Sequence, residues 1–286
     1  MKVAVIGAGL MGSGIAQACA QAGLEVVSID TFPSAIEKAK ANLEALFIKK
    51  VAKGSMTAEK KAEILGRLTY SGSFDDVKEA AIVIEAVPEK IEIKKDTFKK
   101  VDEAADPDTL IVSNTSGLSI SEIASVTNRP DKVMGVHFFY PAPVMKLVEL
   151  VRGLATSDDT YRKVKEFAGQ IGKTTVDAPE YPGFMVNRIL VPMQNEAAFM
   201  VMEGSSPEDV DNAMKLGCNH PMGPIELTDF VGIDTMLASM TGLYNGFHDS
   251  KYRPCPLLET MVKAGHLGRK TGQGFYKYDE KGNKIG

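Results

Sequence analysis

Three glycines and one aspartate near the start of the chain are spaced for binding a dinucleotide. Gly7, Gly9 and Gly12 form the pattern G-x-G-x-x-G directly after the apolar run 2–6. The first glycine permits a tight turn, the second lets a pyrophosphate approach the backbone, and the third lets a helix pack closely on a sheet. Asp30 lies 18 residues after Gly12, where a carboxylate can accept hydrogen bonds from both hydroxyls of an adenosine ribose. Its charge would repel a 2′-phosphate, so the spacing predicts NAD rather than NADP as the cofactor.

The context of the glycine pattern strengthens this prediction. The apolar run before it is typical of a strand, and a helix is predicted from Gly12 to Ala22. The amino terminus of such a helix offers free N–H groups and a positive dipole end to phosphates. We expect Leu10 and Met11 to line the same cofactor site. The alternative is a tight strand-to-helix turn that binds no ligand.

Composition limits the classes of protein to which the chain can belong. Its 286 residues, 44% hydrophobic and 24% charged, are typical of a globular protein with a sizeable core. The net charge of −4 argues against nucleic acid as a partner. The three cysteines lie far apart without C-x-x-C spacing, so we expect neither a disulfide framework nor a metal site. No run of 18 apolar residues and no signal peptide is seen, which favours a cytoplasmic protein without a membrane partner.

Strand-like and helical stretches alternate through the first two thirds of the chain. This alternation predicts an α/β fold, with a Rossmann-type, mostly parallel sheet in a domain of residues 1–181. The predicted strands are Lys2–Ile6, Glu25–Ile29, Ala81–Ala86, Thr109–Ser113, Lys132–Phe138 and Lys146–Val151. The segments Ser34–Lys53 and Thr57–Leu65 exceed the length of about a dozen residues that a simple crossover needs, so we interpret them as an inserted helical hairpin.

The pattern changes at Ala178–Gly183, a segment with two prolines and a glycine. Almost no strand pattern follows it, so residues 182–286 are predicted to form an all-helical C-terminal domain. Helices are predicted over Val186–Glu203, from Ser206 onward, over Pro224–Met240 and over Pro256–Gly265. Pro192 should kink the first of these helices.

Three further motifs give the chain a family resemblance. They are Ser113-Asn-Thr-Ser116-Gly, the block from His137 to Glu149 that begins His-Phe-Phe-Tyr-Pro, and Pro182-Gly-Phe-Met-Val-Asn187-Arg188. With them the chain resembles the L-3-hydroxyacyl-CoA dehydrogenases, and most closely the bacterial members that act on 3-hydroxybutyryl-CoA. The resemblance covers nearly the whole chain. It implies NAD as cofactor, an acyl-CoA as substrate and hydride transfer as the reaction.

The resemblance implies that His137 is the catalytic base and Glu149 its partner, with Ser116 and Asn187 orienting the substrate. General chemistry agrees with the histidine and carboxylate roles. Oxidation of a secondary alcohol needs a proton acceptor at its oxygen, and a carboxylate on the other ring nitrogen fixes the histidine tautomer. Prolines between His137 and Glu149 should reverse the chain and bring the two together. The alternative for Ser116 is a helix or turn cap, and for Asn187 an ordinary surface residue.

The resemblance also implies further contacts to the cofactor and the substrate. Glu89, Lys94 and Lys270 match NAD contacts, although taken alone they would pass for solvated surface charges. Lys49 and Lys53 match lysines that contact coenzyme A, and their spacing of four places them on one face of a helix. A solvated charged face is the alternative for this pair.

One residue departs from the family pattern. Tyr140 stands where the family usually has an asparagine on the nicotinamide side of the site. The larger ring either turns away or reshapes the pocket. We assign Tyr140 to the cofactor site and leave its effect on acyl-chain preference open.

Two other functions compete with a dehydrogenase of acyl-CoA. One is an NAD-dependent dehydrogenase of a hydroxy acid without coenzyme A, and the other is a non-catalytic NAD-binding protein. We also expect a homodimer built through the helical domain, whose methionine-rich helices could bury apolar faces against a symmetry mate. These methionines are Met193, Met200, Met202, Met236 and Met240. The alternative is a core packed within one chain, and the family resemblance decides in favour of the dimer.

Overall fold

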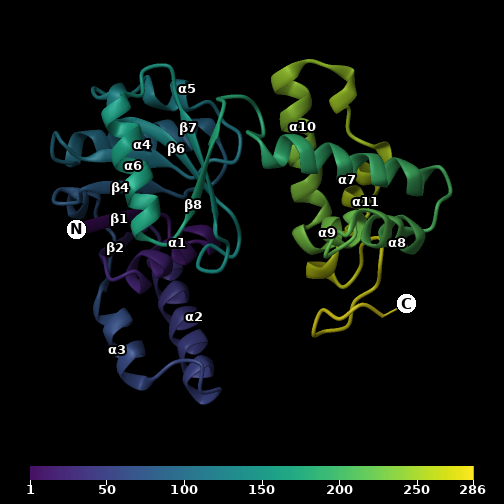
Figure 1. The fold of residues 1–286 in the computed structure, drawn as a ribbon, viewed down its shortest axis with the longest axis horizontal. Coiled ribbons are helices and arrows are strands. Elements are labelled where there is room, and N and C mark those ends of the chain that lie inside the picture. Colours follow the sequence, from purple (N-terminus) through teal and green to yellow (C-terminus); the bar gives the residue numbers. More distant parts are fainter. Residues whose placement is uncertain (286) are drawn as a thin grey trace. The chain divides into compact units, whose positions relative to one another are not determined.

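The structure is a computed structural model that describes residues 1–285. The chain divides into two compact units, residues 1–180 and the residues from Tyr181 onward. In Figure 1 the first unit is coloured purple to teal and the second green to yellow. The first unit combines a sheet with helices, and the second is built from helices.

One sheet forms the centre of the first unit. Within the described residues it has eight strands in the order β3-β2-β1-β4-β5-β6-β7-β8. The bounds are β1 Lys2–Ile6, β2 Glu25–Ile29, β3 Leu68–Ser71, β4 Ile82–Glu85, β5 Leu110–Ser113, β6 Val133–Phe138, β7 Leu147–Arg152 and β8 Thr174–Ala178. All neighbouring strands are parallel except β6 and β7. The predicted mostly parallel, Rossmann-type sheet is confirmed.

Two strands were not predicted, and both lie at an edge of the sheet. β3 and β8 end the strand order, and both carry polar, partly exposed residues. An edge strand has a neighbour on one side only and tolerates polar residues, so it lacks the continuous apolar run of a buried parallel strand. The six strands between them agree with the predicted ones to within one residue at each end.

Helices connect the strands of the first unit. Their bounds are α1 Leu10–Gln21, α2 Pro33–Ala52, α3 Ala58–Gly66, α4 Ile91–Ala104, α5 Ile120–Ala124 and α6 Asp158–Gln170, with short 3-10 helices η1 Phe74–Val77 and η2 Pro130–Lys132. α1 begins at Leu10 rather than at the predicted Gly12, because Gly9 takes the N-cap position.

The predicted helical hairpin is formed by α2 and α3, which project from the sheet in Figure 1. Thr57 starts the second helix of the hairpin, where its hydroxyl accepts a hydrogen bond from the N–H of Lys60 at 3.1 Å. Phe47 on α2 is fully buried and joins Val5 and Ile84 of the sheet in one core. The hairpin is therefore anchored to the sheet by apolar packing.

The second unit contains the predicted all-helical domain. Its helices are α7 Val186–Met202, α8 Pro207–Cys218, α9 Pro224–Val231, α10 Ile233–Phe247 and α11 Pro256–Lys263, with 3-10 helices η3 Ser250–Tyr252 and η4 Arg269–Thr271. α7 continues through Pro192. The single helix predicted over Pro224–Met240 is wrong, because Gly232 separates α9 from α10. Its φ of +105° is incompatible with a continuous right-handed helix.

The core of the second unit corrects part of the dimer argument. Met236 and Met240 are 2% and 0% exposed and pack among buried residues of the same chain. They are therefore core residues and cannot serve as a surface for a symmetry mate. Met200 and Met202 remain exposed at 46% and 44%.

Two kinds of feature are absent from the described residues. Over residues 1–285 no helix combines the length and apolar character needed to cross a membrane. No group of His, Cys, Asp and Glu side chains in this range could hold a metal ion.

Candidate active site

The glycine turn after β1 has space for a ligand at one glycine and for a helix at another. Gly7 has a φ of +100°, which L side chains rarely adopt. A Cβ on Gly12 would lie 1.8 Å from the carbonyl oxygen of Gly7, so α1 can pack on the turn only without a side chain there. A Cβ on Gly9 would meet no atom within 4 Å. The predicted neighbours of the cofactor differ in exposure, since Leu10 is exposed and Met11 packs partly against the core.

The amino terminus of α1 is open to an anion. Its N-cap residue, Gly9, has no side chain to cap the helix, and the first turn contains no acidic residue. The N–H groups of this turn and the positive end of the helix dipole can therefore hold a phosphate.

Asp30 follows β2 and is held against the glycine turn. Its carboxylate accepts a hydrogen bond from the N–H of Ala8 at 2.8 Å and another from the N–H of Phe32 at 2.9 Å. Each carboxylate oxygen keeps a second lone pair, so Asp30 can still accept ribose hydroxyls. Thr31, Phe32 and Pro33 include no cation that could receive a 2′-phosphate. The turn and Asp30 together fit NAD.

A buried ion pair lies next to the carboxyl end of β4. Lys94 on α4 is 1% exposed, and its amine lies 2.7 Å from a carboxylate oxygen of Glu85 and 3.1 Å from one of Glu89. Glu85 is completely buried and also accepts a hydrogen bond from the hydroxyl of Ser113 at 2.6 Å. Buried charges require such partners. The alternative of a solvated surface charge is therefore wrong for Lys94.

Glu85, the buried partner of Lys94, was not predicted from the sequence. It is the last residue of β4, an otherwise apolar strand that ends at the edge of the sheet where ligands of such folds bind. A carboxylate at the end of an apolar strand could have indicated that Glu85 belongs to the site.

Glu89 connects this ion pair to Ser116. One carboxylate oxygen of Glu89 accepts hydrogen bonds from the hydroxyl of Thr115 at 2.6 Å, from the N–H of Ser116 at 2.8 Å and from its hydroxyl at 3.1 Å. Burial acts to raise the pKa of Glu89, but Lys94 and these hydrogen bonds outweigh burial and hold the pKa below its usual value. Ser116 does not cap a helix, because the N-cap of α5 is Ser119. The structure thus brings together three predicted residues, Glu89, Lys94 and Ser116.

His137 and Glu149 face each other across the antiparallel strands β6 and β7. The register pairs them directly, and Nδ1 of His137 lies 2.7 Å from Oε2 of Glu149. His137 is 6% exposed and Glu149 is fully buried. The ring of Phe139 packs on the imidazole, with the two ring centroids 4.5 Å apart. The predicted reversal that brings His137 to Glu149 is confirmed.

A cavity of about 790 Å³ lies in the first unit beside the glycine turn. It is bounded by the start of α1, by one side of α2 and by the turn 140–144 between β6 and β7. Tyr140 lies on its wall with 51% of its surface exposed. Neither His137 nor Ser116 is among the residues that line it. The cavity therefore does not include these two residues predicted to take part in the reaction.

α2 and its C-cap residue, Lys53, present four lysines without acidic partners. Lys38 and Lys50 line the cavity, whereas Lys49 and Lys53, which were predicted to hold coenzyme A, are exposed and lie outside its lining. Across residues 1–285 no carboxylate oxygen approaches any of these four amines within 4.0 Å, although other lysines of the hairpin have such partners. Unpaired ammonium groups on one helix can attract an anionic ligand.

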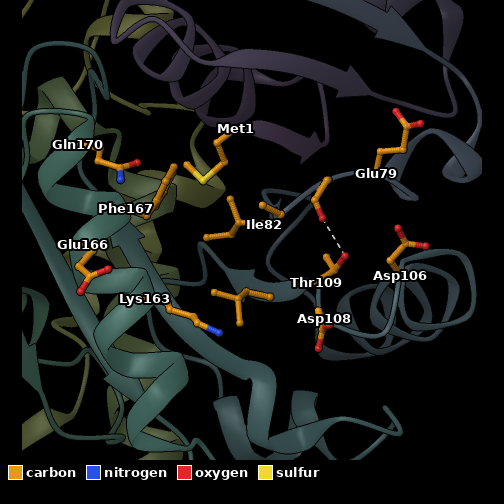
Figure 2. Close-up of a pocket in the computed structure, with 13 residues that line it drawn as sticks. Met1, Glu79, Ile82, Asp106, Asp108, Thr109, Lys163, Glu166, Phe167 and Gln170 are labelled. Atoms are coloured by element: carbon orange, nitrogen blue, oxygen red, sulfur yellow. Dashed lines mark hydrogen bonds between the residues drawn. The ribbon is translucent and has the colours of Figure 1, made fainter.

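A second cavity, of about 450 Å³, lies at the amino-terminal ends of β4 and β5, next to α6 (Figure 2). The apolar ring of Phe167 contributes to its lining, with the carboxylates of Glu79 and Asp108. These carboxylates already pair with Lys2 and Lys132. Ligands of open parallel sheets bind outside the carboxyl ends of the strands, so this cavity is not the candidate active site.

Two predicted site residues belong to the second unit. Asn187 lies in the first turn of α7 and is partly buried. Lys270 lies in η4, and its amine pairs with the carboxylate of Asp234. A Cβ on Gly232 would come within 2.9 Å of this amine, so the glycine between α9 and α10 also makes room for Lys270.

Known proteins show the same two-part organisation. The family model described as the NAD binding domain of 3-hydroxyacyl-CoA dehydrogenase matches residues 2–181, and the model of the C-terminal domain of the same enzyme matches residues 183–278. The chain belongs to the 3-hydroxyacyl-CoA dehydrogenase family. The resemblance seen in the motifs and the prediction of NAD as the cofactor are confirmed.

Individual relatives match over both units. The probable 3-hydroxybutyryl-CoA dehydrogenase of Bacillus subtilis is 49% identical, with 98% of each chain covered. The 3-hydroxybutyryl-CoA dehydrogenase of Clostridioides difficile is 50% identical, with 98% of this chain and 100% of that chain covered. The crystal structure of (S)-3-hydroxybutyryl-CoA dehydrogenase from Ralstonia eutropha has a TM-score of 0.93 at 48% identity, with 98% of this chain and 99% of that chain covered.

Proposed function

We propose that this chain interconverts (S)-3-hydroxybutyryl-CoA and acetoacetyl-CoA with NAD as its cofactor. The observation that carries the proposal is the buried contact between His137 and Glu149, in a domain of the type that binds NAD. Relatives named 3-hydroxybutyryl-CoA dehydrogenase, at 48% to 50% identity over nearly the whole chain, support the choice of substrate.

His137 supplies the base in this proposal. Nδ1–H of the neutral ring donates to Glu149, so the basic lone pair is on Nε2. During oxidation Nε2 takes the proton of the substrate hydroxyl, and Glu149 stabilises the imidazolium that forms. In the reverse direction the imidazolium returns this proton to the carbonyl oxygen. Bound NAD supplies the hydride acceptor or donor.

Ser116 and Asn187 orient the substrate in this proposal. Because the pKa of Glu89 is lowered, its carboxylate is ionised at neutral pH and accepts the hydroxyl hydrogen of Ser116. The lone pairs of the Ser116 oxygen can then accept a hydrogen bond from the substrate hydroxyl. The amide N–H of Asn187 can donate to a carbonyl or enolate oxygen.

The lysines of α2 hold the phosphates of coenzyme A in this proposal. Lys38, Lys49, Lys50 and Lys53 lack acidic partners in the part of the chain that the structure describes, and two of them line the large cavity. In a chain of net charge −4, a local group of unpaired cations provides the attraction that a polyanion requires.

Rates of NADH oxidation with acetoacetyl-CoA and with free acetoacetate test the proposal. We expect turnover of the thioester with NADH, and a kcat/KM at least about tenfold lower with NADPH, because Asp30 repels the 2′-phosphate. Equal efficiency with free acetoacetate would favour a dehydrogenase of a non-CoA hydroxy acid. NAD binding without turnover of either substrate would favour a non-catalytic protein. Equal kcat/KM for the two cofactors would contradict the argument from Asp30.

We also propose that the enzyme works in the cytoplasm. Cys19, Cys218 and Cys255 are all free thiols, and a reducing compartment keeps cysteines in this state. Cell fractionation followed by detection of the protein tests this location, and recovery outside the cytoplasmic fraction would contradict it.

A further inference from the structure

The turn between β6 and β7 carries an exposed aromatic ring. Tyr140 lies three residues after His137, and 51% of its surface is exposed. Its hydroxyl forms no hydrogen bond with any other residue between 1 and 285. Tyr140 nevertheless lines the cavity of about 790 Å³, together with residues of α2. An exposed tyrosine on a cavity wall has a free face and a free hydroxyl for a ligand.

The backbone next to Tyr140 is firmly held. The amine of Lys173 donates hydrogen bonds to the carbonyl oxygens of Ala142 at 2.6 Å and Met145 at 2.7 Å. The N–H of Val144 donates to the carbonyl oxygen of Pro141 at 2.9 Å. Ala142 is 2% exposed, and a Cβ on Gly14 of α1 would lie 3.4 Å from its Cβ. These contacts fix the turn on α1, so the ring is presented to the cavity from a rigid support.

Gly9 and Leu10, which were assigned to the cofactor, are among the lining residues, and the other walls of the cavity match a second ligand. Leu46 on α2 and Val144 on the turn also line the cavity and are 39% and 71% exposed, so they add apolar surface to that of Tyr140. Lys38 and Lys50 add two unpaired ammonium groups. An aromatic face, aliphatic side chains and cations together suit a molecule that joins a planar base and an aliphatic chain to phosphates.

The cavity is separate from the groups assigned to the reaction. Its lining includes neither His137 nor Ser116, and the ring that packs on the imidazole of His137 is that of Phe139. A ligand on Tyr140 therefore contacts it through a part remote from the reacting carbon. Such an interaction is equally strong in the ground state and the transition state, and it changes KM without changing kcat.

We infer that the ring of Tyr140 binds the coenzyme A arm of the thioester and sets the affinity for it. This inference rests on the proposed function. It assigns Tyr140 to the substrate, whereas the motif alone suggested the cofactor. Removal of the hydroxyl and removal of the ring should affect KM to different extents, because only the ring offers a stacking surface.

Steady-state kinetics of Tyr140→Ala test the inference with acetoacetyl-CoA and with acetoacetyl-N-acetylcysteamine, a thioester without the nucleotide. We expect KM for acetoacetyl-CoA to rise about tenfold, the order of an aromatic stacking contact, while kcat stays within about twofold. The KM values for NADH and for the truncated thioester should not change. Tyr140→Phe keeps the ring and should raise KM less than Tyr140→Ala. Leu154→Ala is the matched control, because Leu154 is 94% exposed and lies outside the cavity lining.

Three results would overturn the inference: a KM that rises for NADH alone, a kcat that falls at constant KM, or constants that do not change. If the native protein does not turn over acetoacetyl-CoA, the proposed function fails by itself. Calorimetric titration with coenzyme A then still tests whether the ring of Tyr140 contributes to the affinity for coenzyme A. Binding about tenfold weaker to Tyr140→Ala than to the native protein supports the inference, and equal affinity overturns it.

Discussion

His137 and Glu149 depend on each other at the scale of single residues. The carboxylate of Glu149 is fully buried, and Nδ1 of the imidazole lies 2.7 Å from it. A buried polar or charged group is destabilising without a hydrogen-bond partner, and here each side chain provides that partner for the other. In our proposal the same contact selects the tautomer that can act as a base. The pair therefore combines a structural requirement with a chemical one.

We expect His137→Gln to lose at least about 10²-fold in kcat, the usual contribution of a general base, while binding of NAD is retained. Glu149→Gln should also lose rate with the fold preserved, because the tautomer is no longer controlled. Single-turnover rates and a titration with NAD measure the two properties separately. His248→Asn is the control, since His248 is exposed and its left-handed backbone suits asparagine. A His137→Gln enzyme that turns over like the native one would remove His137 from the mechanism.

At the scale of secondary structure, α2 is the element that we propose to bind a polyanion. Its buried face is held by Ile36, Leu43 and Phe47, which leaves its lysines free to point elsewhere. The hairpin is an insertion between β2 and β3, and its anchoring through apolar packing allows its charged surface to vary without disturbing the sheet. In our proposal the nucleotide arm is thus bound by the helix rather than by the sheet.

We expect the double variant Lys49→Ala, Lys53→Ala to raise KM for acetoacetyl-CoA with little change in kcat. The rise should shrink with added salt, because exposed charges are screened beyond about 10 Å at 0.1 M. The matched control is Lys60→Ala, Lys61→Ala on α3, which removes the same charge from amines already paired with carboxylates. An unchanged KM at low salt would return Lys49 and Lys53 to a solvated surface. The lysines of the cavity lining would then be the remaining candidates.

At the scale of the whole molecule, α7 carries apolar residues that the predicted homodimer could bury. Ile189, Met193 and Met200 recur at spacings of four and seven, which places them along one side of this helix. Ile189 is 74% exposed and Met200 46%. An exposed apolar stripe on a helix of the second unit is the surface that the predicted dimer would bury.

We expect light scattering at micromolar concentration to give twice the chain mass of 30.8 kDa. Met200→Asp should shift the protein toward the monomer, because it places a charge in the apolar stripe. Leu154→Asp, at an apolar residue of the first unit that is 94% exposed, should leave the mass unchanged. A native protein that scatters as a monomer would refute the dimer.

The sequence by itself determined the features that depend on neighbours along the chain. The glycine turn, the six central strands and the opposition of His137 to Glu149 all follow from short-range rules, because a turn, a buried strand and a tight reversal each have their own residue pattern. The motifs also identified the family correctly over both units.

Only the tertiary structure decided which side chains are buried and which partners they meet. Lys94 lies between two carboxylates, although residue type alone suggested the surface. Met240 fills the core of its own unit, although the predicted dimer placed it at an interface. The edge strands β3 and β8 form because a neighbouring strand offers backbone groups for hydrogen bonds. Their polar residues do not by themselves indicate a strand. Tyr140 faces a cavity that α1, α2 and the turn build together. The burial of a side chain and the partners that it meets depend on segments distant in sequence, so a local residue pattern cannot predict them.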